Sequence, residues 1–270
     1  MVLVGPARCG APRTHLCLSM ELSTAMEATT LDDFLAELDY LDEKEAEQGR
    51  IWALSDIHTD HAENLEWIRS LEQDGRYAKD TLLLAGDVSD KNEVLRETLA
   101  SLAASFATVF FVPGNHDLWV RRESEESSLD KLAAVLALCS ELGVRTRPAF
   151  AGGAVIVPLL SWYHSSWDTE PDITGWKKIP PIRLVMRDFS ATRWPEGLEC
   201  GGEALAEYFD ALNDGRAALS AASEGLPTPE AQAQAQADGA FAARVAALRD
   251  AHPGAPTISL GHFVPCVSSG

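Results

Sequence analysis

The chain has 270 residues, of which 46% are hydrophobic and 23% charged, and its formal net charge is −19. This length and composition are typical of one large or two small globular domains, and no apolar run is long enough to span a bilayer. The acidic balance argues against a nucleic-acid surface, which needs clustered Lys and Arg. It leaves room for a phosphorylated substrate, because bound cations can reverse the local field of a site.

The N-terminal residues 1–29 have the composition of a leader. They contain no acidic residue before Glu21 and include Arg8 and Arg13, so we interpret them either as an unstructured leader or as an organelle transit peptide. The five cysteines are widely spaced and form no C-x-x-C pair, which favours reduced thiols over a disulfide framework. We therefore expect a cytoplasmic protein, or a plastid protein if the leader is a transit peptide.

Residues 30–49 are predicted to form an acidic amphipathic helix. Thr30 is a good N-cap, apolar residues follow at helical spacing as far as Leu41, and Gly49 ends the segment. The other face is dense with Asp and Glu. That pattern indicates a solvated face or, alternatively, a contact surface for an unknown protein partner.

After this helix, strand and helix patterns alternate. Buried strands are predicted at Ile51–Leu54, Thr81–Ala85 and Thr108–Val112, with helices between them at 62–71 and 91–106. Strands alternating with helices in this way are typical of a parallel sheet with right-handed crossovers.

Ligand-type side chains directly follow each of these three strands. They are Asp56 and His58 after the first strand, Asp87 after the second, and Asn115, His116 and Asp117 after the third. Ligands bind beyond the carboxyl ends of the strands in open α/β sheets, so these three loops should converge in space. Mixed carboxylate, amide and imidazole ligands suit Mn, Fe or Zn better than Mg or Ca.

The second half of the chain has weaker patterns. Further helices are predicted at 128–142, 202–219 and 241–248, and further strands at 154–160 and 256–260. Residues 165–201 hold several Trp and Pro without a clean period, which favours an ordered excursion over a linker. Residues 225–239, where Gln alternates with Ala, are predicted to be a flexible low-complexity insertion.

Two histidines in this half are candidate site residues. His262 follows the last predicted strand and is either another metal ligand or a hydrogen-bonding core histidine. His164 either lines a substrate pocket or packs with Trp162.

The candidate ligands predict a site with two metal ions. Asp87 has a second carboxylate oxygen that could bridge from one ion to the other. Two ions about 3.5–4 Å apart would clamp a phosphoryl group and turn a bridging water into a nucleophilic hydroxide. His116 could then protonate the leaving oxygen as general acid, with Asp117 orienting His116.

Three short motifs carry a resemblance to a known family. D-x-H at 56–58, G-D at 86–87 and G-N-H-D at 114–117, in this order and spacing, resemble the calcineurin-like metallophosphoesterase superfamily. The longer strings W-A-L-S-D-I-H-T-D and F-F-V-P-G-N-H-D-L-W further resemble an uncharacterised plant and algal branch. The resemblance covers residues 50–270 apart from the insertion, and it implies an α/β (α+β) fold, a β-sandwich flanked by helices.

The resemblance also implies which residues hold each metal. Asp56, His58 and Asp87 would hold the first, and Asp87, Asn115 and His262 the second, with His116 as general acid. The family pattern ends in G-H-x-H, whereas the late block of this chain is G-H-F-V-P at 261–265. The resemblance therefore implies a chain truncated before the G-H-x-H block, with an incomplete fold and metal site.

Two classes of function remain open from the sequence. The first is a phosphoric ester hydrolase that uses two metals on a phosphorylated substrate, whether a monoester, a diester or a pyrophosphate. The alternative is a pseudo-enzyme or interaction module that keeps the fold with an incomplete metal site.

Overall fold

The computed structural model describes six parts of the chain. These are residues 49–71, 75–120, 125–171, 175, 179–214 and 241–263. The predicted leader, the predicted acidic helix up to residue 48 and the predicted insertion at 225–239 lie outside them.

The first sheet consists of three parallel strands in chain order, β1 (Ile51–Leu54), β2 (Thr81–Ala85) and β3 (Thr108–Val112). Helix α2 (Ala62–Ser70) connects β1 to β2, and helix α3 (Asn92–Ser105) connects β2 to β3. The predicted strand bounds are confirmed to the residue, and the helices end within one residue of the predicted positions. A parallel sheet with helical crossovers is therefore confirmed.

The second sheet is mixed, with the order β4–β5–β6. Strand β4 (Ala149–Ala151) pairs antiparallel with β5 (Ala154–Pro158), and β5 pairs parallel with β6 (Thr257–Leu260). Gly152 and Gly153 make the turn between β4 and β5 with φ angles of 57° and 78°, the positive values that a two-residue hairpin turn requires. Strand β4 was not predicted from the sequence, while β5 and β6 lie within the predicted strands.

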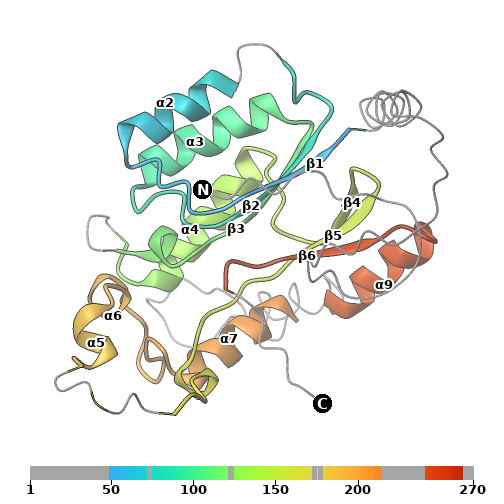
Figure 1. The fold of residues 1–270 in the computed structure, drawn as a ribbon. Helices are drawn as coiled ribbons and strands as arrows, with labels where there is room; N and C mark the ends of the chain where they lie inside the picture. Colours follow the sequence, from blue (N-terminus) through green and yellow to red (C-terminus); the bar gives the residue numbers. More distant parts are fainter. Residues whose placement is uncertain are drawn as a thin grey trace.

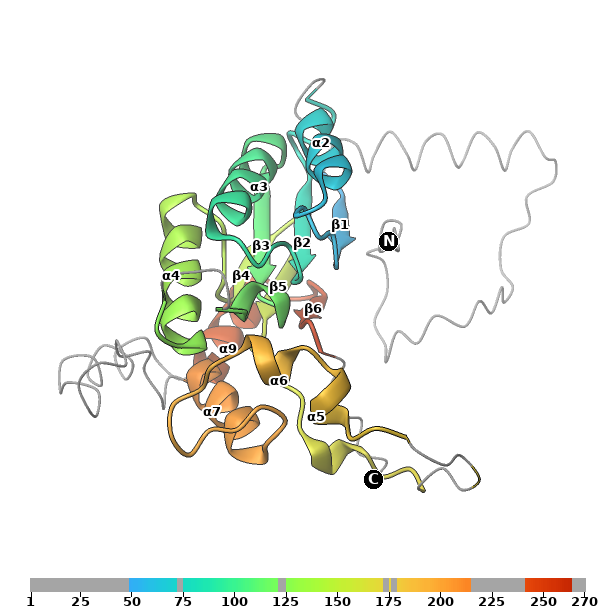
Figure 2. The same cartoon turned by 90° about the vertical axis from the view of Figure 1, so that its left-hand side faces the viewer.

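The two sheets pack face to face, with helices on both outer sides (Figures 1 and 2). Side chains alternate between the two faces of a strand, so Leu83 points to the second sheet while Leu82 and Leu84 point away. The core between the sheets contains Leu83, Phe110, Val112, Ala149, Ala154, Ile156 and Leu260. The predicted β-sandwich is thus observed.

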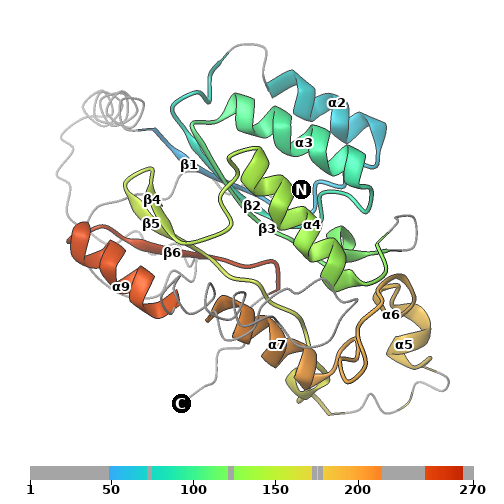
Figure 3. The ribbon, with the colours of Figure 1, turned by 180° about the vertical axis from the view of Figure 1, so that it is seen from behind.

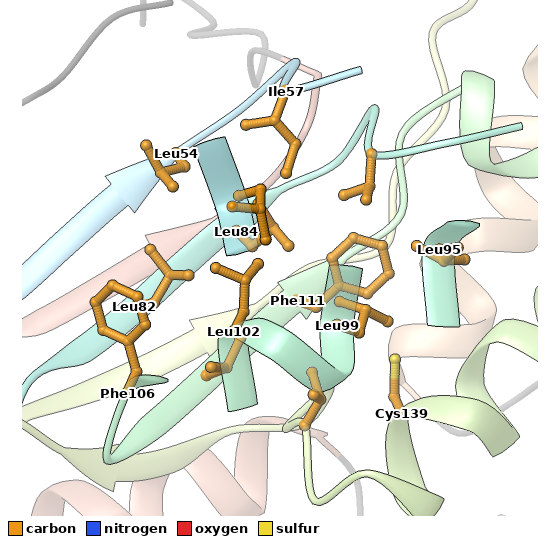
Figure 4. Close-up of a cluster of buried hydrophobic side chains, with 14 of the residues drawn as sticks. Leu54, Ile57, Leu82, Leu84, Leu95, Leu99, Leu102, Phe106, Phe111 and Cys139 are labelled. Carbon is orange, nitrogen blue, oxygen red and sulfur yellow. The ribbon is translucent and has the colours of Figure 1, made fainter. Parts of the chain in front are cut away.

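The outer face of the first sheet is covered by α2, α3 and α4 (Ser128–Glu141). Figure 4 shows this core, in which Leu82, Leu84 and Phe111 of the strands meet the α3 side chains Leu95, Leu99 and Leu102. Helix α9 (Phe241–Ala251) covers the second sheet (Figure 3). The predicted flanking helices are confirmed, and no helix among the described residues is long and apolar enough to cross a membrane.

A third hydrophobic core includes residues from the described part of the predicted excursion at 165–201. It gathers around Trp162, whose ring contacts Tyr163, Trp194, Phe209 and Phe263. The elements of this region are the 3-10 turn Ser165–Trp167 and the helices α5 (Ile182–Val185), α6 (Asp188–Ala191) and α7 (Glu203–Asn213). Helices α5 and α6 lie on the side to which the strands of the first sheet point (Figure 2).

Candidate metal centre

The loops that follow β1 and β2 stay paired beyond the strands. The backbone N–H groups of Asp56 and His58 donate to the carbonyl oxygens of Gly86 and Asp87, both at 3.0 Å. Asp56, His58 and Asp87 all adopt left-handed backbones, with φ angles of 53°, 40° and 55°. Residues other than glycine adopt such angles rarely and at a cost in energy. The strained positions of the described chain are therefore three of the predicted metal ligands.

Glycines let the loops after β2 and β3 come close together. A Cβ atom at Gly114 would lie 2.3 Å from Asp87 Oδ1, and one at Gly86 would lie 2.4 Å from the backbone nitrogen of Gly114. Real Cβ atoms do not approach other atoms so closely, so the glycine in G-D and the glycine in G-N-H-D are both required by this packing. This explains physically why those two motifs contain glycine.

The side chain of Asp117 joins the loops after β2 and β3 by hydrogen bonds. Its carboxylate is fully buried and accepts four backbone N–H bonds, from Asp87 (2.8 Å), Val88 (2.9 Å), Ser89 (3.0 Å) and Gly114 (2.8 Å). Burial raises the pKa of Asp117 and outweighs the lowering effect of the amide bonds. None of these four bonds involves the His116 ring, so the role of orienting that ring stays a prediction.

Asp87 lies at the centre of the candidate site. One oxygen, Oδ1, accepts the backbone N–H of His116 at 2.9 Å and lies 3.5 Å from His262 Nε2. The other, Oδ2, lies 4.0 Å from His58 Nε2 and 3.9 Å from His116 Nε2. Burial, reinforced by the nearby Asp117 carboxylate, raises the pKa of Asp87 to about 7. A nearby metal cation would favour the charged form of this carboxylate.

The Nε2 atom of His262 lies close to both Asn115 Oδ1 and Asp87 Oδ1. His262 Nδ1 lies 2.7 Å from the carbonyl oxygen of Ala85; a carbonyl only accepts, so we assign the ring proton to Nδ1. In the neutral ring Nε2 then carries a lone pair, and it lies 3.1 Å from Asn115 Oδ1. His262 Nε2 thus has two other acceptor oxygens within 3.5 Å, which fits a shared cation, and this nitrogen and oxygen chemistry fits the predicted Mn, Fe or Zn.

The structure thus brings the predicted ligands together. The potential ligands form two groups, and within each group the ligand atoms lie within 4.8 Å of one another. The first group is His58, Asp87 and His116, and the second is Asp56, Asp87 and His262. Asp87 belongs to both groups, as a bridging ligand should. The grouping differs from the sets implied by the resemblance, because His116 joins His58 while Asp56 lies beside His262. The number and identity of the ions stay a prediction.

His116 is half-buried between two rings. Its imidazole stacks on Trp119 with ring centroids 3.7 Å apart, and it meets His58 edge-on at 4.7 Å. Burial, together with the neighbouring His58, lowers the pKa of His116. The stacking fixes the plane of the ring that the sequence analysis assigned as general acid.

His164 has local contacts. Its Nδ1 lies 2.7 Å from Ser166 Oγ, and its ring centroid lies 5.0 Å from that of Trp167. The suggested packing partner, Trp162, instead packs in the third core described above. A role of His164 in a substrate pocket stays a prediction.

Asp188, which was not predicted from the sequence, contacts the candidate ligand Asn115. Asp188, the first residue of α6, accepts hydrogen bonds from Asn115 Nδ2 (2.9 Å), Trp119 Nε1 (2.7 Å) and Tyr163 Oη (3.0 Å). Asp188 lies 73 residues from Asn115 in a segment without periodicity, so no pattern marked it.

Comparison with known proteins shows the family of the chain. Residues 49–184, about half of the chain, match the family model of the calcineurin-like phosphoesterases. The chain belongs to the calcineurin-like phosphoesterase family. The family match covers the loops after β1, β2 and β3 and ends before Asp188 and His262, so those two residues are placed by the structure alone.

The chain is similar to one characterised protein, for which both the sequence and a crystal structure can be compared. Over 126 residues the chain is 33% identical to the [acyl-carrier-protein] phosphodiesterase PptH of Mycobacterium tuberculosis, covering 43% of this chain and 38% of that protein. The aligned part is thus well under half of the relative. The crystal structure of phosphopantetheinyl hydrolase PptH from the same organism is 24% identical, with a TM-score of 0.42 over 79% of this chain and 68% of that chain.

Proposed function

We propose that this protein is a metal-dependent phosphoric ester hydrolase whose site lies at the carboxyl end of the first sheet. One observation carries the proposal: Asp87 sits between the imidazoles of His58, His116 and His262, with nitrogen-to-oxygen distances from 3.5 to 4.0 Å. Family membership supports the same reaction class.

The site residues would have two roles, metal binding and proton donation. Asp56, His58, Asp87, Asn115 and His262 would hold two ions, which supply the positive charge that binds a phosphoryl group and lowers the pKa of an attacking water. His116 would donate a proton to the leaving oxygen from its Nε2, with its ring held in plane by Trp119.

The first substrate class to test is a phosphodiester. The relative that shares 33% identity over the matched region is named as a phosphodiesterase. A phosphomonoester and a pyrophosphate are the other two classes that the chemistry of the site admits.

His116 could be the general acid or a metal ligand, because it also lies among the potential ligand residues. Substrates with different leaving groups distinguish these two roles. The change is His116→Ala, assayed with Mn²⁺ on one substrate with a nitrophenolate leaving group and one with an alkoxide leaving group. If His116 is the acid, kcat for the alkyl substrate falls by about 10²–10⁴-fold, while the nitrophenyl substrate is hydrolysed nearly as before. Equal losses on both substrates, together with reduced metal content, would make His116 a ligand instead.

Metal content and activity, measured together, distinguish this hydrolase from the alternative of a pseudo-enzyme. The wild-type protein should bind Mn²⁺ and hydrolyse bis(p-nitrophenyl) phosphate, and Asp87→Asn should do neither. Two metal-free, inactive proteins with identical stability would instead favour an interaction module.

A further inference from the structure

Asn115 can serve as a ligand in only one orientation of its amide. Its Oδ1 faces His262 Nε2 at 3.1 Å, while its Nδ2 donates to Asp188 Oδ1 at 2.9 Å. A flipped amide would place the carbonyl oxygen against the Asp188 carboxylate, and both groups are acceptors. It would also turn N–H groups toward the space between His262 and Asp87. The contact with Asp188 therefore selects the orientation in which the Asn115 oxygen points to the candidate metal.

Asp188 is itself held rigidly. The residue is 1% exposed. Oδ1 accepts from Asn115 and from the Trp119 indole, and Oδ2 accepts from the Tyr163 hydroxyl. A buried carboxylate with hydrogen bonds on both oxygens has little freedom to rotate, and it can impose its geometry on a weaker partner such as an amide.

The three partners of Asp188 come from two separate segments, the one that follows β3 and the one that follows β5. Asn115 follows β3, Trp119 follows the 3-10 turn His116–Leu118, and Tyr163 follows β5. Asp188 begins α6, a helix that contributes none of the predicted ligands. Through Trp119, the same carboxylate also supports the ring on which His116 stacks. Helix α6 is thereby connected both to the candidate ligand Asn115 and, through Trp119, to His116.

We propose that Asp188 is the positioning residue that orients Asn115 as a metal ligand, and so sets the affinity of the site formed by Asn115, His262 and Asp87. This inference rests on the proposed metal-dependent function. Residues that hydrogen-bond to ligands typically contribute 10–100-fold to metal affinity, and that range defines the expected effect.

The test is a calorimetric Mn²⁺ titration of the 270-residue chain and its variants. Asp188→Ala should weaken Mn²⁺ binding by about 10–100-fold. Asp188→Asn should restore most of the affinity, because an amide oxygen can still accept from Asn115 and Trp119 while its nitrogen donates to the Tyr163 oxygen. In an Asn115→Ala background, Asp188→Ala should cause little further loss, because the two residues act through one contact.

Asp80→Asn is the matched control. Asp80 is also a buried carboxylate bonded to an indole, Trp52 Nε1 at 2.7 Å, but it lies at the opposite end of the first sheet. Its substitution should leave Mn²⁺ affinity within about 2-fold of wild type, in line with the near-independence of distant sites.

The outcomes separate the two proposals. A wild-type protein that binds no Mn²⁺ would overturn the proposed function, whereas a folded Asp188→Ala protein with wild-type affinity would overturn only the role of Asp188. If Asp188→Ala does not fold, side-chain amide exchange in the wild-type protein decides. The Asn115 amide protons should exchange more slowly than those of a solvated asparagine, and exchange at the solvated rate would refute the orientation by Asp188.

Discussion

The two ends of the first sheet use buried carboxylates in opposite ways. At the amino end, Asp80 accepts from the Arg50 backbone N–H at 2.8 Å and the Trp52 indole at 2.7 Å, so both of its oxygens meet donors that join β2 to β1. At the carboxyl end, Asp87 meets imidazole nitrogens at 3.5–4.0 Å and takes a left-handed backbone. The first end is built for stability. The second keeps acceptor groups close together at a cost in stability, which is the usual sign of a binding site.

The largest expected effect tests the carboxyl end directly. Asp87→Asn removes the charge that both candidate ligand groups share. Phosphodiester hydrolysis should fall by more than about 100-fold, beyond the loss typical of residues that only support ligands. Turnover and bound Mn²⁺ measured on the same samples check this. If activity stayed within 10-fold of wild type, Asp87 would not be a ligand.

The second prediction concerns pH in the metal-free protein. Burial raises the pKa of Asp87 from 3.8 to about 7, so the folded state keeps a proton that the unfolded state loses. Stability relative to Asp87→Asn should therefore fall as pH rises from about 4 to about 7 and then level off, by up to about 4 kcal/mol at about 1.4 kcal/mol per pKa unit.

Chemical unfolding of both metal-free proteins across this pH range provides the measurement. Comparing the two removes the contribution of His116, whose lowered pKa acts in the opposite direction as pH falls. Mn²⁺ at a concentration 100 times the Kd should add about 2.7 kcal/mol to the stability of the wild type and so offset part of this fall. A pH-independent difference would show that Asp87 is ionised without a metal.

The third prediction concerns Asp117, which lies at the carboxyl end of the sheet but has a stabilising role like that of Asp80, because its oxygens accept hydrogen bonds from the backbone. Asp117→Asn leaves one acceptor oxygen for four backbone N–H groups and turns an amide N–H toward some of them. The free energy of unfolding should fall by about 3 kcal/mol or more. Urea unfolding checks this, with the exposed Asp168→Asn as control. A loss below about 1 kcal/mol would contradict the clamp between the two loops.

Local sequence patterns predicted the ligand loops well. Thr81–Ala85 and Thr108–Val112 are continuous apolar runs that stop at glycine or proline, so both their ends and the polar residues beyond them could be located. Parallel pairing then required the loops to meet, and the structure brings them together.

Long-range contacts left no such pattern. β4 has only three residues, too few for an alternation to be recognised, and β5 pairs with β6 across about a hundred residues. The Asp117 carboxylate joins the loops after β2 and β3 through bonds to their backbones, and no local sequence pattern predicted those bonds. Asp188 acts through side-chain hydrogen bonds from a short helix, and only the folded chain shows them.

The smallest expected effect belongs to Asp80, and it separates the two ends most cleanly. Asp80→Asn keeps one acceptor oxygen for the Arg50 N–H or the Trp52 indole and turns an amide N–H toward the other donor. Stability should fall by about 1–3 kcal/mol, the cost of one unpaired buried donor. Hydrolysis and Mn²⁺ affinity should stay unchanged, because the sheet lies between Asp80 and the ligands. A urea titration and an activity assay on the same preparation measure both. If Asp80→Asn lowered Mn²⁺ affinity as Asp188→Ala is expected to, strain would pass along the strands, and the division between a stabilising end and a binding end would be wrong.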